Sequence, residues 1–404
     1  MSINLTQLIA EIEAAANAAN ASTSITDLVK IAMAADKVGG GFINYDSAGA
    51  LPTGDSDYLG MTAYRSDTQA MYVYNGNQWD LLDSSSVPWS MPYNYIGNNF
   101  GYVAGGKENN SPSLGTNAIE KYSFTSDGNS WDMGDLWSTV KLAAGTSSLT
   151  HGYTSGGYAL PQPNYNTITK FPFANYSTGT VAGNLTVGRY YTAGVTGYVS
   201  GYTVGGYQVP AGTVIDKFPF AADGNATDVG DLLVRRIWAA TTQSRENGYI
   251  MGDGGGSSAS YQKFSLASDG NAAYSGAVTA GGGRRKAAGV SSFTDGYFVG
   301  GNLFTTNPNT ETYSAQIDKF PFAADGVSAD VGDTVGTFVQ HTATSGSTHG
   351  YIAGGWLNPY LIISASQIQK FPYASSSNSV SVGGLIHGGV GGKGPRQEAT
   401  GHQV

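Results

Sequence analysis

The sequence predicts an all-β fold built mainly from six similar segments, and three observations support it. A Gly-Tyr pair recurs six times after residue 100, each time followed by a short apolar run that usually ends in Gly-Gly. A lysine followed by an aromatic residue comes after a variable loop in every repeat. The repeats recur at intervals of about 50 residues, and a period of roughly 40 to 50 with several β-prone runs is typical of a β-propeller blade. We therefore expect a six-bladed β-propeller. The pairs begin at Gly101, Gly152, Gly201, Gly248, Gly296 and Gly350, and the lysines are Lys121, Lys170, Lys217, Lys263, Lys319 and Lys370.

The composition excludes several classes of protein. The chain has 404 residues, no cysteine and a net charge of -9, and only 12% of its residues are charged. Without cysteine there are no disulfides and no thiolate metal sites. Nucleic-acid binding needs a basic surface, which this balance does not provide. The chain has no run of about 20 apolar residues for a membrane helix, and its N-terminus lacks the features of a signal peptide. We expect a soluble protein without nucleic-acid binding, membrane insertion or export by the usual route.

Residues 1–40 are expected to form two short helices. An apolar stripe at the spacing i, i+3, i+4 and i+7 predicts the first, and a capping-box-like start at Ser24 and Asp27 predicts the second. Helices this small cannot bury their stripes against each other, so we expect them to pack on another chain. The alternative is a mobile leader. The expected attachment residues are Leu5, Leu8, Ile9, Ile12 and Leu28.

Residues 41–87 are expected to form a small β-meander module and a linker. Short β-prone runs are separated by Ser66-Asp67-Thr68 and by Asn75-Gly76. Asn-Gly accepts the positive φ angles of a tight hairpin turn, which predicts antiparallel neighbours. The polar stretch from Asp83 to Pro88 then reads as the linker.

Residues 88–404 are expected to form the propeller, with four short strands in each unit. The strands fall before Gly-Tyr, from Gly-Tyr to Gly-Gly, around the Lys-aromatic pair, and around motifs such as Asp-Val-Gly-Asp. Segments like the first strand occur once more at Tyr93–Phe100 and at Gln397–Val404. Either could complete the first blade and close the ring. We favour the C-terminal segment, and a partial seventh blade is the alternative.

Two parts of the sequence resemble known families. The segments Leu59–Tyr64 and Tyr72–Trp79, preceded by small helices and followed by Gly-rich repeats, resemble virion structural proteins of tailed bacteriophages. That resemblance implies a tail-fibre-like appendage, attached to the particle by its N-terminus and assembled in the host cytoplasm. It also implies a homo-oligomer and suggests a trimer, although no heptad run supports that number. The Gly-Gly doublets resemble those of kelch repeats, but the later Tyr and Trp of that family are not recognisable, so its binding sites are not carried over.

Acidic blocks in three repeats are candidates for metal binding. Asp127–Asp135, Asp223–Asp231 and Asp325–Asp333 each hold three carboxylates in nine residues. The spacing of a calcium-binding loop is absent, and their Asp-Gly steps fit hairpin turns better. No Ser-His-Asp or paired-Glu constellation stands out from the repeat. We expect no metal, no cofactor and no catalytic residue.

A cation precedes the first strand in five of the six units. Rotational repetition would place such residues in a ring on one face, where they could attract anionic groups. The alternative is that each pairs with a nearby surface aspartate such as Asp231. This candidate basic ring contains Lys141, Arg189, Arg236, Arg284 and Arg396.

The loops between Gly-Gly and the Lys-aromatic strand differ most between repeats. Equivalent connections of a propeller emerge on the same face, so these loops are expected to form one surface. Aromatic residues beside Asn and Thr suit sugar rings or protein partners. The alternative is that the aromatic side chains pack into the blades. The candidate binding residues are Tyr158, Tyr165, Tyr207, Phe304, Tyr313, Trp356 and Tyr360.

Together these features predict a non-enzymatic phage virion protein. Its N-terminal region would contact other virion proteins, and its propeller loops would meet a host surface glycan or protein, as in a tail-fibre-like adhesin. One alternative is a head, neck or tail decoration protein that contacts only other virion proteins. A glycan-cleaving propeller enzyme ranks third.

Overall fold

The chain divides into two compact units, Met1–Pro92 and Tyr93–Val404. The computed structural model describes residues 43–45, 62–65, 70–74, 79–82, 96–108, 115–159, 165–208, 211–253, 259–278, 283–303, 312–357, 363–364, 366–386 and 396–404. Almost all regular structure among them is β, and the helix in this part of the chain is the short 3-10 turn Ala211–Thr213. The expected N-terminal helices, with Leu5, Leu8, Ile9, Ile12 and Leu28, lie outside the described residues.

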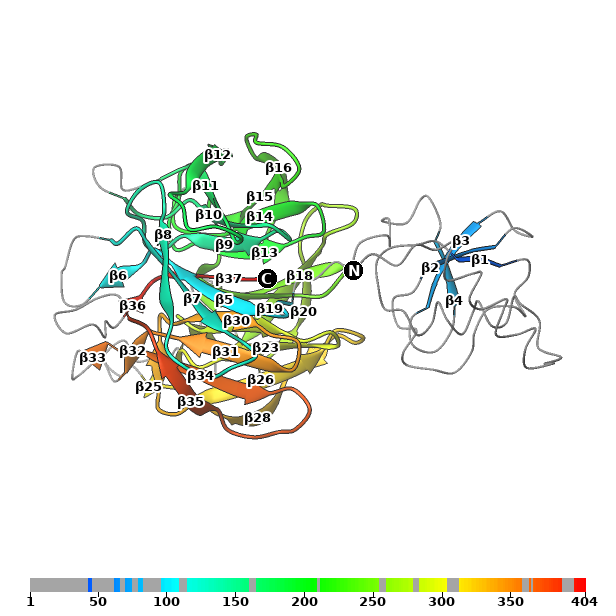
Figure 1. Ribbon diagram of the computed structural model, residues 1–404. Coiled ribbons are helices and arrows are strands. Elements are labelled where there is room, and N and C mark those ends of the chain that lie inside the picture. The colour runs from blue at the N-terminus through cyan, green and yellow to red at the C-terminus, as the bar shows by residue number, and fades with distance from the viewer. Residues whose placement is uncertain are drawn as a thin grey trace, which may run out of the picture. The chain divides into compact units, whose positions relative to one another are not determined.

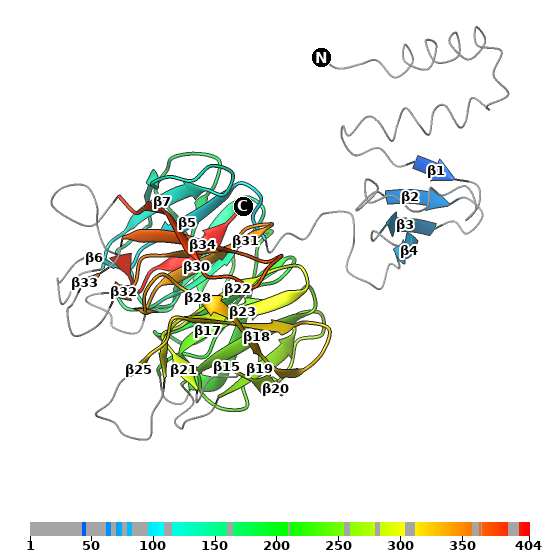
Figure 2. The ribbon, with the colours of Figure 1, turned by 90° about the horizontal axis from the view of Figure 1, so that it is seen from below.

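The first unit contains one four-stranded sheet with the strand order β1-β2-β3-β4 (Figure 2). Its strands are β1 (Ile43–Tyr45), β2 (Thr62–Arg65), β3 (Ala70–Tyr74) and β4 (Trp79–Leu82). Strands β2, β3 and β4 are antiparallel neighbours, as the turn motifs predict, and Tyr74 lies opposite Trp79. Strand β1 pairs in parallel with β2, which the sequence analysis did not anticipate.

The described part of the second unit contains six main antiparallel sheets, each built around one Gly-Tyr repeat, and three smaller sheets of two or three short strands (Figure 1). We number the six main sheets in the order of the repeats and call the first strand of each its inner strand. Sheet 1 is β37 (Thr400–Gln403), β5 (Phe100–Ala104), β7 (Ala118–Ser123) and β8 (Trp131–Asp135); sheet 2 is β9 (Ala144–Ser147), β10 (His151–Ser155), β11 (Thr167–Pro172) and β12 (Thr180–Asn184). Sheet 3 is β13 (Ala193–Thr196), β14 (Ser200–Val204), β15 (Val214–Pro219) and β16 (Thr227–Asp231).

The other three sheets follow the same order. Sheet 4 is β17 (Ile237–Gln243), β18 (Asn247–Asp253), β19 (Ser260–Ser265) and β20 (Ala273–Ala277), with β27 (Gly326–Val327) added in parallel at its edge. Sheet 5 is β22 (Ala288–Ser291), β23 (Asp295–Val299), β26 (Gln316–Pro321) and β28 (Ala329–Asp333). Sheet 6 is β30 (Thr342–Ser345), β31 (His349–Ala353), β34 (Gln367–Pro372) and β35 (Val380–Gly384).

The C-terminal strand completes sheet 1. Strand β37 pairs with β5, with Thr400 opposite Ala104 and His402 opposite Tyr102. The prediction that Gln397–Val404 supplies the missing first strand is therefore confirmed. The other candidate segment ends at Phe100, which begins the second strand of this sheet.

The six inner strands surround a common centre. They contact one another in the cycle β9, β13, β17, β22, β30, β37 and back to β9. At one register position, each strand donates a backbone N–H to a side-chain oxygen of the next strand, over 2.9 to 3.5 Å, until the cycle closes. Its members, in order, are Ser147, Thr196, Gln243, Ser291, Ser345 and Gln403.

Glycine is required where inner strands and aromatic rings approach each other closely. A Cβ on Gly289 of β22 would overlap the backbone oxygen of Thr241 in the neighbouring inner strand. A Cβ on Gly152 would overlap the Phe171 ring of the same sheet, and the other five Gly-Tyr glycines face an aromatic ring in the same way. The Gly-Tyr motif therefore leaves room for the aromatic residue that follows the lysine.

The repeated tyrosines pack between sheets. Tyr102 stacks on Phe173 of the next sheet with 4.6 Å between ring centroids, and Tyr351 stacks on Phe124 at 4.5 Å, which joins sheet 6 to sheet 1. The Tyr351 hydroxyl also donates to the Phe124 carbonyl over 3.0 Å. Such pairs contribute dispersion and ring electrostatics beyond burial alone. Equivalent ring contacts join Tyr153 to Phe220, Tyr249 to Phe322 and Tyr297 to Tyr373.

The repeated lysines link neighbouring sheets through the Asp-Gly connections. In four repeats the lysine ammonium pairs with the aspartate that follows the third strand of the next sheet. These aspartates include the first member of each acidic block, so the blocks act in contacts between sheets. The pairs are partly exposed and contribute at most about 1 kcal/mol each. They are Lys170–Asp223 (2.6 Å), Lys217–Asp269 (2.9 Å), Lys263–Asp325 (2.6 Å) and Lys370–Asp127 (2.7 Å).

Candidate functional site

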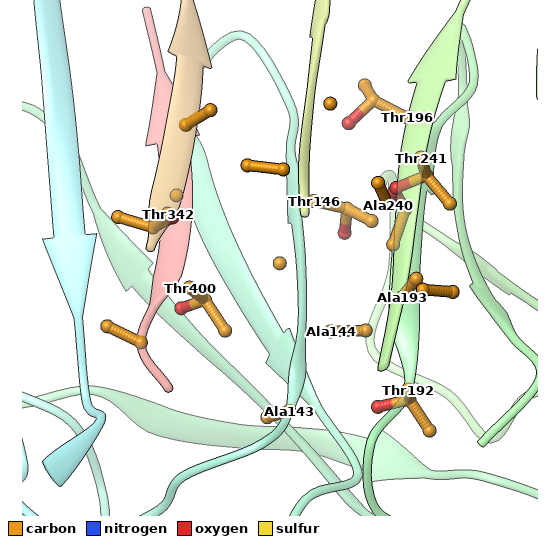
Figure 3. Close-up of a pocket in the computed structure, with 18 of the residues that line it drawn as sticks. Ala143, Ala144, Thr146, Thr192, Ala193, Thr196, Ala240, Thr241, Thr342 and Thr400 are labelled. Carbon is orange, nitrogen blue, oxygen red and sulfur yellow. The ribbon is translucent and has the colours of Figure 1, made fainter. Parts of the chain in front are cut away.

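A cavity of about 130 Å³ lies between the inner strands, and we call it the axial cavity. It is lined mainly by alanine, glycine, serine and threonine from all six repeats (Figure 3). Figure 3 shows Ala144, Thr196, Thr241, Thr342 and Thr400 on the strands that enclose it. The lining side chains are small and mostly uncharged, and their polar groups are hydroxyls, amides and the His341 imidazole.

A ring of six residues with left-handed backbone surrounds one end of this cavity. In the described part of the chain, seven non-glycine residues have positive φ, and six of them occupy the same position of the six repeats, with φ from 46° to 60°. Each directly precedes a residue that lines the cavity, such as Ala143 or His341. We call these six residues the mouth ring: Leu142, Tyr191, Trp238, Lys286, Gln340 and Glu398.

Backbone hydrogen bonds hold the mouth ring together. The N–H of Leu142 donates to the Glu398 carbonyl over 3.0 Å, and Glu398 donates to Gln340 over the same distance. Gln340 donates to Lys286, and Lys286 to Trp238, each over 2.9 Å. In these four repeats the left-handed conformation thus aims the N–H at the preceding repeat around the ring.

The absence of glycine from the mouth ring indicates that its side chains matter. A left-handed backbone costs a non-glycine residue about 1 to 2 kcal/mol, and glycine avoids that cost. The chain contains 58 glycines and uses them at positive φ in the Gly-Gly doublets, yet places none in the mouth ring. Strained non-glycine residues of this kind gather at binding sites.

The mouth ring has an aromatic side and a polar side. The ring centroids of Tyr191 and Trp238 lie 4.5 Å apart, and the Lys286 ammonium lies 5.3 Å from the Trp238 ring centroid. On the polar side, the Gln340 side-chain amide donates to a Glu398 carboxylate oxygen over 3.2 Å. Burial raises the pKa of Glu398, and the nearby ammonium groups of Lys141, Lys107 and Lys286 oppose that rise, so attraction to cations favours its charged form.

The variable loops begin beside the mouth ring. In five repeats the residue before the mouth-ring position pairs with the residue just after the Gly-Gly doublet, and in the fourth it pairs with Asp253, which stands in place of the second glycine. These pairs are Lys141–Tyr158, Tyr190–Tyr207, Ile237–Asp253, Arg285–Asn302, Val339–Trp356 and Gln397–Lys107. The loop face and the mouth ring are therefore one surface.

Aromatic rings extend outward from the mouth ring along this surface. Tyr190 lies 4.7 Å from Tyr191, 5.4 Å from Tyr207 and 5.9 Å from Tyr158, measured between ring centroids. The Lys141 ammonium lies 5.2 Å from the Tyr158 ring centroid. This arrangement offers a stacking surface with cations at its edge.

The predicted binding residues have different outcomes. Tyr158, Tyr207 and Trp356 lie beside the mouth ring, and Tyr207 is 42% exposed. Tyr165 instead packs against the buried cluster around Tyr102, as the alternative interpretation expected, and its hydroxyl lies 3.1 Å from Ser138 Oγ. Tyr313 is half-buried in the short strand β25 (Thr312–Tyr313), opposite Asn302. Phe304 and Tyr360 lie outside the described residues.

The prediction of an exposed basic ring is wrong for three of its five members. Arg189, Arg236 and Arg284 are buried. Arg189 pairs with Asp216 over 3.1 Å, Arg284 pairs with Asp318, and Arg236 donates to the Gly252 carbonyl over 2.7 Å. Arg189 and Arg284 therefore pair with buried aspartates and not with the surface aspartates of the alternative interpretation. Burial lowers the pKa of Arg284 to about 10, so it remains charged at neutral pH.

The two remaining members of the basic ring are placed differently. Lys141 is half-buried on the loop face, where its ammonium lies 3.7 Å from a Glu398 carboxylate oxygen. Arg396 belongs to the short strand β36 (Arg396–Gln397), opposite Glu108.

The mouth-ring residues were missed in the sequence analysis. The signal becomes visible when the repeats are aligned on their inner strands, because the residue two places before Ala144, Ala193 or their equivalents differs in every repeat. The position just before it also differs in every repeat, whereas the two positions after it are mostly alanine or threonine.

Comparison with protein-family models gives no match, and comparison with curated proteins gives none either. Within the described ranges, no three His, Cys, Asp or Glu side chains are grouped to hold a metal ion. The same residues include no helix of the length and apolarity needed to cross a membrane.

Proposed function

We propose that the second unit is a six-bladed, kelch-like β-propeller that binds a saccharide at its mouth ring. Support for the propeller comes from the hydrogen-bond cycle through Ser147, Gln243 and Ser345 and their equivalents, because it joins six sheets around one axis. The biological role we propose is that of a non-enzymatic, tail-fibre-like virion adhesin. Its N-terminal region attaches to other virion proteins, and its loop face meets a host surface glycan.

One observation carries the binding proposal: six equivalent backbone positions at the cavity mouth present six different side chains. Saccharide recognition needs an aromatic face for the sugar ring and polar groups for its hydroxyls. Tyr191 and Trp238 supply the face, and Gln340, Glu398 and Lys286 supply donors and acceptors.

A binding role fits this site better than glycan cleavage. Most glycoside hydrolases need two carboxylates that flank the scissile bond. Within the mouth ring, Glu398 is the sole carboxylate, and its closest charged partner is Lys141. We therefore propose no catalytic residue.

The test is binding of the purified full-length chain to host cells. Trp238→Ala and Tyr191→Ala should each weaken binding by about tenfold or more, because a buried aromatic contact is commonly worth over 1 kcal/mol. Tyr274→Ala is the matched control, since Tyr274 is 60% exposed on strand β20 of sheet 4. Equal binding by all three variants and the parent chain would rule out the mouth ring as the receptor site.

Exposed apolar residues at the opposite end of the inner strands favour a second candidate, the decoration protein. Leu149, Val199 and Phe293 lie in the turns that follow three inner strands and are 50%, 58% and 62% exposed. Neighbouring apolar side chains in water mark protein contacts. This candidate predicts that Phe293→Ser lowers incorporation into particles, whereas Trp238→Ala leaves both incorporation and host attachment unchanged.

A further inference from the structure

Five aromatic side chains form a continuous row from the mouth ring outward along the loop face. The ring centroid of Trp238 lies 4.5 Å from that of Tyr191, Tyr191 lies 4.7 Å from Tyr190, and Tyr190 lies 5.4 Å from Tyr207. Tyr158 meets the same Tyr190 ring edge-on, at 5.9 Å. We call these residues the aromatic row: Tyr158, Tyr190, Tyr191, Tyr207 and Trp238.

The aromatic row occupies one side of the loop face. In sheets 5, 6 and 1, the positions equivalent to Tyr190 hold Arg285, Val339 and Gln397, so no ring stands there. Trp356, which is equivalent to Tyr207, has no ring contact with the row among the described residues. A ligand that follows the rings therefore leaves the mouth ring in one direction, across the loops of sheets 2 and 3.

The tyrosine hydroxyl groups of the row differ from those of the repeated tyrosines. Within the described part of the chain, the hydroxyls of Tyr158, Tyr190 and Tyr207 have no hydrogen-bond partner. By contrast, the Tyr102 and Tyr351 hydroxyls donate to backbone carbonyls of the next sheet, over 3.3 and 3.0 Å. Each tyrosine of the outer row thus offers a ligand both an apolar ring and a hydroxyl group.

Contacts between the rings hold the row in place. The planes of neighbouring rings are inclined by 50° to 80°, a tilted packing in which each ring restricts the rotation of the next. Cations contact the outer rings, because the Lys141 ammonium lies 5.2 Å from the Tyr158 centroid and the Arg235 guanidinium lies 5.8 Å from the Tyr207 centroid. A surface ordered before binding loses little side-chain entropy when a ligand arrives.

We infer that the ligand is an oligosaccharide of at least three sugar units that extends from the mouth ring along the aromatic row. This inference rests on the proposed saccharide-binding function. Tyr207 is joined to Trp238 through Tyr190 and Tyr191, so contact with both ends of the row needs a ligand longer than one sugar. The mouth-ring pair, Tyr190 and Tyr207 provide three successive contacts, one for each unit.

The experiment measures how binding by the full-length chain depends on saccharide length. An array holds glucans, galactans, mannans and N-acetylglucosamine oligomers, each as the mono-, di-, tri- and tetrasaccharide. For at least one series, affinity should rise about tenfold or more between one and three units, because each added unit gains an aromatic contact. The fourth unit should add little, since the row ends at Tyr207. Calorimetry on the best series gives the dissociation constants.

Four variants assign the length dependence to the row. Tyr207→Ala should abolish the gain from the third unit while leaving mono- and disaccharide binding unchanged, and Tyr207→Phe separates the hydroxyl from the ring. Trp238→Ala should weaken binding at every length, because it removes a mouth-ring contact. Trp356→Ala is the matched control, since Trp356 lies on the loop face outside the row, and it should keep the length dependence of the parent.

The outcomes separate this inference from the function on which it rests. Equal affinity for one and three units, with loss of both in Trp238→Ala, would overturn the extended ligand and leave the saccharide site intact. A gain with length that persists in Tyr207→Ala would overturn it as well, because the third unit would then lie elsewhere. A parent chain that binds no member of the array would count against both proposals.

Discussion

Where the inner strands begin, six equivalent backbone positions carry six different side chains, whereas at the other end of the sheets the repeats reuse the same lysine, aspartate and aromatic residues. The reused residues contact the next sheet, so each is constrained by the shape of its neighbour. The mouth-ring side chains also contact their neighbours, as Tyr191 does Trp238 and Gln340 does Glu398, but these contacts differ from repeat to repeat. Variation inside a repeat thus separates residues that present chemistry from residues that hold sheets together.

The largest expected effect concerns a residue at which neighbouring sheets pack together. Gly289→Ala should lower the free energy of unfolding by about 3 kcal/mol or more, because the new Cβ would overlap the Thr241 backbone, which cannot move without shifting an inner strand. Gly326→Ala is the control, since a Cβ there would meet no atom within 4 Å. Urea denaturation measures both variants. A Gly289→Ala chain as stable as the control would show that the inner strands are not closely packed.

A second prediction concerns His402, which stands in inner strand β37 where the other inner strands carry threonine or valine. Burial lowers the pKa of His402 to about 4. Its folded pKa lies below the unfolded value of 6.5, so the unfolded chain binds the proton first as the pH falls. Stability is therefore full above pH 6.5 and should be lost progressively as the pH falls to about 4, by about 3 kcal/mol for this group.

Denaturation at several pH values checks this loss. His402→Gln should flatten part of the decline, and His341, whose pKa burial also lowers to about 4, contributes another part. His349→Gln should change the slope less, because His349 is half-buried at the start of β31. A slope that is the same in all variants would mean that inner-strand histidines do not control acid stability.

Much of the fold could be predicted because its signals are local and repeated. The Gly-Tyr pairs located the second strands, and the Asp-Gly steps located connections such as the one at Asp223. The burial of Arg189 could not be predicted, because arginine is rarely fully buried and its partner Asp216 comes from another strand. The mouth ring was also missed, because positive φ is expected of glycine and the strain at Trp238 or Lys286 arises from contacts between repeats.

The smallest predicted effect concerns the mouth ring, where non-glycine side chains are retained although the left-handed backbone is strained. Gln340→Ala removes the side chain but keeps a left-handed residue, whereas Gln340→Gly also relieves the strain at φ 55°. The glycine variant should be more stable than the alanine variant by about 1 kcal/mol, since glycine adopts this conformation freely. Both variants should lose the hydrogen bond to Glu398 and bind saccharide more weakly than the parent. If alanine and glycine gave equal stability, backbone strain at Gln340 would be negligible, and the absence of glycine from the mouth ring would no longer indicate selection for its side chains.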